Sequence, residues 1–290
     1  MIINRDTIIK AYEESEIGEY AIPHFNHSDF WDMSFIVEAA NEKDAPVIVA
    51  CLPRVAERYG LDKLTLMMNF YSKHSEVPII YHLDHCHDVD FCKRAIDAGF
   101  HSVMIDAASL SLEENIKTVK EVVDYARPRG VFVESEIGQI KSAGEEGYTP
   151  VSFKATVDEA MKLVEESDVD SLAVSIGSEH GFYAHAPELD FELLKRIKEK
   201  IPVPLVLHGG SGIPAKDVKT AIKHGIRKVN VGTEIRHTYI TSLNASISEN
   251  GAGVHTIDLF EEARIATKAV LGSWIEIDGA AGKGRKTYEK

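Results

Sequence analysis

Three histidines stand beside acidic or glycine-rich residues, and each comes after a short apolar run. His85 directly follows Asp84, His180 lies in the segment GSEHG, and His208 opens the segment HGGSG. Three imidazoles with an open fourth position are a common arrangement for a catalytic zinc ion, and zinc accepts ligands that are far apart in sequence. These three histidines are therefore candidate metal ligands, although a single histidine among the 13 in the chain would more often be an ordinary core or surface residue.

Carboxylates accompany the histidines. Asp84 precedes His85, so in a locally extended backbone the two side chains should point to different sides. An aspartate beside a metal can donate and accept protons without being a ligand, whereas the alternative role for Asp84 is only to orient a histidine. Asp106, Glu134 and Glu136 also follow apolar runs and would add negative charge nearby.

Two glycine-containing segments could bind a phosphate. HGGSG (208–212) precedes a helix that should start near Pro214, and NVGT (230–233) also opens a helical pattern. Backbone N–H groups of such loops and helix N-termini bind anions. One glycine loop alone is a weak signal, because such turns often only join a strand to a helix. Two of them after consecutive strands make a stronger one.

Eight short apolar runs, unbroken rather than alternating, are typical of parallel strands covered on the outside and packed within. Amphipathic segments separate them: Leu64, Met67, Met68 and Tyr71 follow helical spacing, and Ser111 with Glu114 and Thr156 with Glu159 have the pattern of capping boxes. The expected strands are Tyr20–Phe25, Pro46–Ala50, Pro78–Leu83, Ser102–Ile105, Val131–Val133, Ser171–Val174, Pro204–Leu207 and Lys228–Val231.

Eight strand-then-helix units favour a closed (β/α)8 barrel, the TIM-barrel class of α/β fold, over an open sheet. We expect one catalytic domain over residues 1–290, with a C-terminal helical extension after about Thr233, an interruption near 251–253 and a mobile tail at GAAGKGRK (279–286). The carboxyl ends of barrel strands share one face, where active sites lie. Six of the eight strands would deliver polar or glycine-rich ends to that face.

Composition excludes some functions. The net charge of −14 argues against nucleic acid as a partner, because binding a duplex needs a basic surface. No apolar run reaches the length of a membrane span, and the N-terminus lacks the apolar stretch of a signal peptide. Cys51, Cys86 and Cys92 are an odd number without zinc-ribbon spacing, so we expect buried thiols, not ligands or disulfides, and a cytoplasmic location.

The segment GQIKSAGEEGYT (138–149) is polar, contains three glycines and lacks apolar periodicity. We interpret it as a mobile loop over the site that carries Glu145 and Glu146. The alternative is an acidic loop that is merely solvated.

Six motifs, taken together, resemble the class II, zinc-dependent fructose-bisphosphate and tagatose-bisphosphate aldolases. The resemblance runs from Ala21 to about Glu234 and weakens after that. The motifs are HLDH (His82–His85), SVMID (Ser102–Asp106), VESEIG (Val133–Gly138), GSEHGFY (Gly177–Tyr183), LHGGSGIP (Leu207–Pro214) and KVNVGTE (Lys228–Glu234).

The resemblance implies roles for individual residues. His85, His180 and His208 would hold a catalytic Zn²⁺, and Asp106 and Glu136 would form an acidic pair offering an alternative or second metal position. Asp84 would be the acid/base at the hydroxyl of the cleaved bond, and Glu145 or Glu146 would exchange a proton with the carbon of dihydroxyacetone phosphate. The phosphorylated half of the substrate, with a monovalent cation (Na⁺ or K⁺) nearby, would contact Asn26, Gly181, Gly209, Gly210, Ser211, Asn230, Val231, Gly232 and Thr233.

The implied reaction is reversible retro-aldol cleavage. It leaves negative charge on the enediolate of dihydroxyacetone phosphate, and a divalent metal spreads that charge without a lysine Schiff base. Histidine-only ligation leaves the metal a full dication and therefore a stronger Lewis acid than carboxylate ligation would.

The chain departs from the family mainly around the aldehyde. Ala50, Cys51 and Leu52 replace the polar set after the second strand, Ala107-Ala108 replaces Gly-Ser, and no Asp-Pro-Arg segment for the far phosphate is visible near the C-terminus. His24, His27 and His87 are candidates for lining that half, or are ordinary polar residues.

Fructose 1,6-bisphosphate is the first substrate expected, with tagatose 1,6-bisphosphate second, releasing dihydroxyacetone phosphate and an aldehyde (glyceraldehyde 3-phosphate). The alternatives are an aldolase with another aldehyde partner, a metal-dependent sugar-phosphate isomerase or epimerase, and a non-catalytic barrel subunit, against which the intact Asp84 and three histidines speak. A homodimer or homotetramer is expected, with no nucleic-acid or membrane partner.

Overall fold

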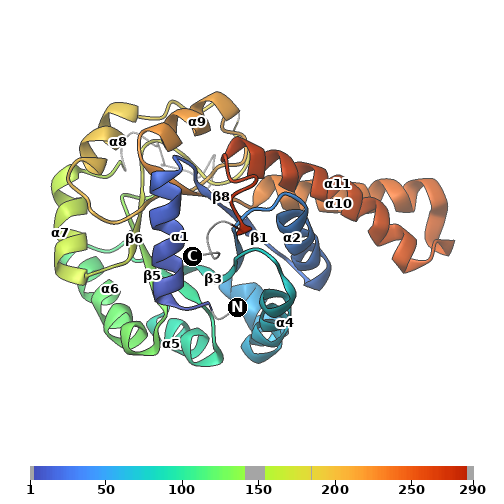
Figure 1. Ribbon diagram of the computed structural model, residues 1–290, viewed down its shortest axis with the longest axis horizontal. Helices are drawn as coiled ribbons and strands as arrows, with labels where there is room; N and C mark the ends of the chain where they lie inside the picture. Colours follow the sequence, from blue (N-terminus) through green and yellow to red (C-terminus); the bar gives the residue numbers. More distant parts are fainter. Residues whose placement is uncertain (1–2, 141–153, 184, 286–290) are drawn as a thin grey trace.

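Eight parallel strands close into a barrel in the computed structural model, which describes residues 3–140, 154–183 and 185–285. Each strand pairs with the next in sequence and the eighth pairs with the first, with helices around the outside (Figure 1). The predicted (β/α)8 barrel is confirmed. The strands are β1 (Ile22–Asn26), β2 (Val47–Cys51), β3 (Ile79–Cys86), β4 (Ser102–Ile105), β5 (Phe132–Ile137), β6 (Ser171–Val174), β7 (Leu205–Leu207) and β8 (Ile226–Val231).

The helices pack apolar faces against the barrel, as their spacing predicts. In α4, Leu64 and Met68 are buried, while Met67 and Tyr71 pack at the edge of the core. The helical elements are α1 (Arg5–Ile17), α2 (Phe30–Glu42), α3 (Pro53–Tyr59), α4 (Leu61–His74), α5 (Val89–Ala98), α6 (Leu112–Ala126), η1 (Arg127–Arg129), α7 (Val157–Ser167), α8 (Phe191–Lys198), α9 (Ala215–Lys223), α10 (Thr233–Asn250), η3 (Gly251–Gly253) and α11 (Thr256–Ile277).

Helix starts follow the capping chemistry of the sequence. Ser111 and Glu114 form the predicted reciprocal capping box at α6. At α7, Thr156 Oγ1 accepts a hydrogen bond from the Glu159 N–H at 3.3 Å and donates one to the Glu159 carboxylate at 2.6 Å. These bonds satisfy backbone N–H groups in the first turn of each helix and fix the residue at which the helix begins.

Three strands are longer than predicted. β8 begins at Ile226, two residues before the expected Lys228, and the other two extend at their carboxyl ends. β3 continues past Leu83 to Cys86, and β5 continues past Val133 to Ile137. The apolar runs of β3 and β5 end before the strands themselves do, because the following strand residues include Asp84 and Glu134. Both carboxylates are buried although they are polar, with exposures of 3% and 1%. These carboxylates belong to the strands themselves, not to the loops after them.

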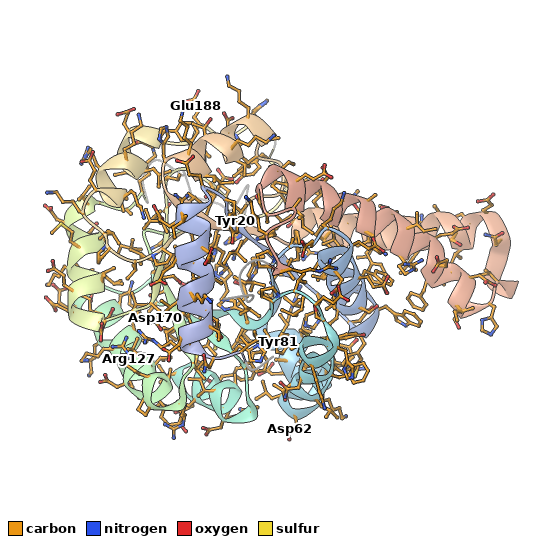
Figure 2. All side chains as sticks on the ribbon, viewed as in Figure 1. Tyr20, Asp62, Tyr81, Arg127, Asp170 and Glu188 are labelled. Atoms are coloured by element: carbon orange, nitrogen blue, oxygen red, sulfur yellow. The ribbon has the colours of Figure 1, made fainter. Side chains whose placement is uncertain are left out.

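Helix α1 covers the end of the barrel where the strands begin (Figure 1). The Arg5 guanidinium lies 2.7 Å from the Asp170 carboxylate, which directly precedes β6 and also contacts Arg127 at 3.5 Å (Figure 2). Tyr12 of α1 stacks on Phe132 at the start of β5, with ring centroids 5.4 Å apart. Access to the barrel is therefore from the opposite, carboxyl-terminal end.

The C-terminal extension is helical, as predicted. Helices α10 and α11, joined through η3, lie side by side and extend away from the barrel (Figure 1). The tail was predicted to be mobile, and this is wrong for 279–285. Gly282 N–H donates to the Lys43 carbonyl at 2.9 Å and Gly284 N–H to the Asp44 carbonyl at 2.7 Å. Gly284 lies so close to the turn after α2 that a Cβ there would be 2.9 Å from the Asp44 carbonyl carbon.

Cys51, Cys86 and Cys92 are free and buried, as expected. Among the described residues, no helix combines the length and the apolar character needed to cross a membrane.

Candidate active site

A cavity of about 580 Å³ opens at the carboxyl ends of the strands. Most of the predicted site residues meet there. It is lined by Asn26, Leu52, Asp84, His85, His87, Asp106, Ala108, Ser109, Glu136, Gln139, Ile140, His180, Gly181, Phe182, Gly209, Ser211, Asn230, Gly232, Thr233 and Arg236.

The three candidate metal ligands form one cluster. His85 is on β3, His180 follows β6 and His208 follows β7, and one ring nitrogen from each lies within 4.8 Å of the others. The His85 ring centroid is 4.7 Å from that of His180 and 4.6 Å from that of His208, with the rings nearly perpendicular.

Carboxylates engage the outer nitrogens of two of these rings. His85 Nδ1 is 2.9 Å from the Asp106 carboxylate, and His208 Nε2 is 3.0 Å from the Glu134 carboxylate. The inner nitrogens, His85 Nε2 and His208 Nδ1, are 2.8 Å apart. A carboxylate on the far nitrogen fixes the tautomer and orientation of a metal-bound histidine.

The residues fit a divalent metal ion. His180 Nε2 is buried without a hydrogen-bond partner among the described residues. Burial alone would lower the pKa of His85. The nearby carboxylates of Asp84, Asp106 and Glu136 instead raise this pKa to about 10, so the local field strongly favours positive charge. His85, Asp106 and Glu136 also lie within 4.8 Å of one another, which places the acidic pair beside the histidine cluster.

His85 adopts an unusual backbone conformation. Its φ is +48°, in the left-handed region that non-glycine residues rarely adopt. The pairing of β3 with β4 also shifts register between Leu83 and Cys86. As a result Asp84 and His85 both line the same cavity. The prediction that their side chains point to different sides was wrong, because it assumed a regularly extended strand.

Two amides hold the Asp84 carboxylate. Asn26 Nδ2 donates to it at 2.9 Å and Asn230 Nδ2 donates at 3.3 Å. Burial acts to raise the pKa of Asp84, but the positive charges of His85 and Lys228 outweigh it and hold the pKa well below its usual range. Asp84 is therefore an ionised, positioned carboxylate that can accept a proton.

The glycine-rich loops form one wall. Gly209, Ser211, Gly232 and Thr233 line the cavity. Gly209 has φ +70°, and a Cβ there would lie 2.1 Å from the Glu179 carbonyl oxygen, so only glycine fits. Gly232 has no side chain to cap α10, and the Ser211 hydroxyl accepts a hydrogen bond from the Glu234 N–H at 3.1 Å. The start of this helix therefore directs N–H groups and a hydroxyl toward the cavity wall, where an anion would be favoured.

Gly210 and Val231 lie outside the cavity lining. Gly210 N–H donates to the Asn230 carbonyl at 2.9 Å, and Val231 is fully buried beside Phe25 on β1. Of the predicted aldehyde-side histidines, His87 lines the cavity, whereas His24 and His27 are buried away from it. Glu145 and Glu146 lie outside the described residues.

A buried ion pair that was not predicted from the sequence lies behind His208. Lys228 Nζ lies 2.6 Å and 2.8 Å from the two carboxylate oxygens of Glu134, and both side chains are at most 1% exposed. The signal was present, because a lysine and a glutamate inside apolar strands must be paired if both are buried. Arg236 and Phe182, which also line the cavity, were missed as well.

The chain is similar to known proteins over most of its length. The profile of the family described as fructose-bisphosphate aldolase class-II matches residues 6–283. A 6-phospho-5-dehydro-2-deoxy-D-gluconate aldolase from Halalkalibacterium halodurans is 44% identical over 225 residues, which are 77% of this chain and 78% of that protein.

Solved structures give the same result. The YdjI aldolase from Escherichia coli K12 is 33% identical with a TM-score of 0.83, over 95% of this chain and 98% of its own. A putative fructose-1,6-bisphosphate aldolase from Coccidioides immitis is 27% identical with a TM-score of 0.85, over 97% of this chain and 98% of its own.

Proposed function

The chain belongs to the class II fructose-bisphosphate aldolase family and is an aldolase, a carbon–carbon lyase, and from that premise we propose that it cleaves a phosphorylated ketose to dihydroxyacetone phosphate and an aldehyde. One observation carries the proposal: the ionised Asp84 carboxylate lines one cavity together with His85 and His180, and a ring nitrogen of His208 lies within 4.8 Å of a ring nitrogen of each of these two histidines. A base beside a Lewis-acid site is what retro-aldol cleavage requires.

The histidine cluster would hold Zn²⁺, the metal on which the family depends. When bound, this ion stabilises the negative charge that develops on the enediolate of dihydroxyacetone phosphate. Asp106 and Glu136 offer a second acidic position beside it. A monovalent cation near the substrate phosphate belongs to the same proposal.

The chain's own residues would bind the phosphate and transfer the protons. The N–H groups at the start of α10 and the Gly209 loop would bind the phosphate, with the Ser211 hydroxyl beside them. Asp84, held by Asn26 and Asn230, would take the proton from the hydroxyl next to the cleaved bond. Returning a proton to the enediolate carbon is the role proposed for Glu145 or Glu146.

The far end of the substrate meets a lining with little positive charge. Arg236 is the single lysine or arginine among the described residues that line the cavity, and Leu52, Ala108 and Phe182 contribute apolar surface. A substrate with two phosphates would therefore find few positively charged side chains to bind its second phosphate. A carboxylate at the far end carries less charge than a phosphate, and the acid named for the Halalkalibacterium halodurans relative has one. We propose this acid as a substrate beside fructose and tagatose 1,6-bisphosphate.

Trapping both products tests the reaction. Each ketose phosphate is incubated with zinc-loaded enzyme, dihydroxyacetone phosphate is measured by its NADH-linked reduction, and the aldehyde is captured as a hydrazone. We expect the two products in equal amounts. If ketose phosphates are interconverted and no aldehyde is trapped, the enzyme is an isomerase or epimerase and not an aldolase acting by cleavage.

The homodimer or homotetramer remains a proposal. It is supported by α10 and α11, which extend beyond the barrel (Figure 1) and expose four large apolar side chains to about half of their area or more. These are Ile240, Ile247, Ile257 and Ile265. Light scattering on the purified protein would show a mass of one chain if the proposal is wrong.

A further inference from the structure

Two histidines are buried inside the barrel next to Asp84. His24 on β1 is 0% exposed and His82 on β3 is 1% exposed, and neither lines the cavity. Their rings meet edge to face with centroids 5.5 Å apart. With Asp84, each offers one ligand atom within 4.8 Å of the others. We name these three residues the inner cluster.

Three nitrogens of the inner cluster have no hydrogen-bond partner among the described residues. They are both ring nitrogens of His24 and Nε2 of His82, and all are fully buried. The other His82 nitrogen is bonded to Ser102 Oγ at 2.8 Å, which fixes the ring. A buried polar atom without a partner costs free energy, so such atoms call for an explanation.

The spacing within the inner cluster differs from that of direct hydrogen bonds. Asp84 Oδ1 is 3.6 Å from His24 Nε2 and 4.0 Å from His82 Nε2, whereas N–H···O bonds are about 2.7–3.2 Å long. Tetrahedral metal bonds of about 2.0–2.2 Å place two ligand atoms roughly 3.3–3.6 Å apart. The His24 distance matches this separation, and the 4.0 Å distance to His82 exceeds it by a few tenths of an ångström, which the ring would close on binding. A water bonded to both at about 2.8 Å would spread them to roughly 4.5 Å.

We propose that His24, His82 and Asp84 form a second metal site for a late first-row divalent ion such as Zn²⁺ or Co²⁺. Two imidazoles and one carboxylate are donors that these ions accept. The site is separate from the cluster of His85, His180 and His208 and from the acidic pair Asp106 and Glu136.

The surrounding charges permit a cation there. Burial, reinforced by Lys228, lowers the pKa of His24 and of His82, which keeps both rings in the neutral, ligating form. The charge of Lys228 is itself paired with Glu134. An ion would enter through the cavity, because Asp84 is the member of the inner cluster that lines it.

Occupation of this site has a consequence that rests on the proposed function. An ion bound to Asp84 would take the carboxylate needed as the acid/base, so metal in excess of the catalytic ion should inhibit. At a free Zn²⁺ concentration about ten times the dissociation constant of the inner cluster, the rate should fall about tenfold by mass action.

Metal counting tests the site without relying on activity. Metal-free wild type, His24→Leu and His27→Gln are equilibrated with Zn²⁺, desalted and measured by mass spectrometry of the metal, and Co²⁺ binding is followed by visible absorption. His27 is the matched control, a buried histidine whose nitrogens face Asp29 and Tyr81 instead of the inner cluster. We expect His24→Leu to bind one ion fewer than wild type and His27→Gln to bind the same number.

The proposal is overturned if wild type and His24→Leu bind equal numbers of ions. Circular dichroism checks the fold of each variant, and His24→Gln, which keeps a polar side chain, replaces the leucine variant should that one fail to fold. Loss of zinc inhibition in His24→Leu supports the inhibitory role, and unchanged inhibition contradicts it. Absence of any aldolase activity would refute the proposed function while leaving the metal count to decide the site.

Discussion

His208 Nδ1 and His85 Nε2 face each other at 2.8 Å, and the opposite nitrogen of each ring is bonded to a carboxylate. Asp106 holds His85, and Glu134, itself paired with Lys228, holds His208. The two rings are thus oriented by the barrel before any ion binds. Preorganised ligands of this kind lose little entropy when the metal arrives.

Zinc dependence is the first expectation. Exhaustive chelation should abolish activity and Zn²⁺ or Co²⁺ should restore it, because in the proposed reaction a divalent ion stabilises the enediolate charge. His208→Ala should lose bound metal, measured by mass spectrometry, and keep its circular dichroism spectrum. Full activity of metal-free enzyme, or a lysine adduct trapped by borohydride, would contradict this. Lys228, the buried lysine near the site, is ion-paired with Glu134.

Asp84→Ala should reduce kcat by about a hundredfold or more, the usual scale for a positioned acid/base. The catalytic metal content should not change, since Asp84 is not among the three histidine ligands. Asp88→Asn serves as the control, because Asp88 is an exposed cap of α5 in the same segment and asparagine caps equally well. With Zn²⁺ limited to one equivalent per chain, so that the histidine cluster alone is counted, a fall in activity that tracks loss of that ion would assign Asp84 a purely structural role.

The two loop glutamates should differ. Glu145→Gln and Glu146→Gln each remove one acid, and the critical variant should lose tritium exchange between water and dihydroxyacetone phosphate, because that exchange reports proton transfer at carbon. The other variant then serves as the matched control. Wild-type exchange rates in both single variants would remove the loop from the mechanism.

Substrate preference should depend weakly on a second phosphate. We compare kcat/KM for fructose 1,6-bisphosphate, tagatose 1,6-bisphosphate, fructose 1-phosphate and 6-phospho-5-dehydro-2-deoxy-D-gluconate. One charge-assisted contact is worth about 1.5–3 kcal/mol, so fructose 1,6-bisphosphate should exceed fructose 1-phosphate by roughly tenfold to a hundredfold only.

The acid should match or exceed both bisphosphates in that comparison, because Arg236 is the single lysine or arginine among the described lining residues. A ratio of a thousandfold or more between fructose 1,6-bisphosphate and fructose 1-phosphate would reveal a strong far-phosphate site and rule out this explanation.

Acid should weaken the fold through His27. Burial lowers the pKa of this imidazole to about 4, outweighing the opposing hydrogen bond to Asp29, whereas the unfolded chain has a pKa of about 6.5. The unfolded state therefore binds the proton first, and the stabilisation present above pH 6.5 is lost as the pH falls toward 4. Between pH 7 and pH 5 the group should cost about 2 kcal/mol of unfolding free energy.

Urea unfolding of wild type and His27→Gln at both pH values measures that contribution. The variant should lose about 2 kcal/mol less than wild type over this interval. Equal losses in the two proteins would show that His27 does not titrate as inferred.

The sequence by itself determined the barrel and the meeting of its reactive residues. Eight apolar runs separated by amphipathic segments leave a closed parallel barrel as the expected arrangement, and in a barrel the ends of distant strands share one face. His85, His180 and His208 could therefore be brought together without coordinates. Their proximity follows from topology, which depends on patterning alone.

Only the tertiary structure decided the details that depend on side-chain direction and pairing. A register shift and the left-handed backbone of His85 turn Asp84 and His85 toward one cavity. The strand β3 continues through these two polar residues, so a prediction based on unbroken apolar runs ends the strand too early. The pairing of Lys228 with Glu134 and the convergence of His24 on Asp84 join residues far apart in sequence. Such contacts are set by strand stagger around the closed barrel, a long-range property that no local pattern encodes.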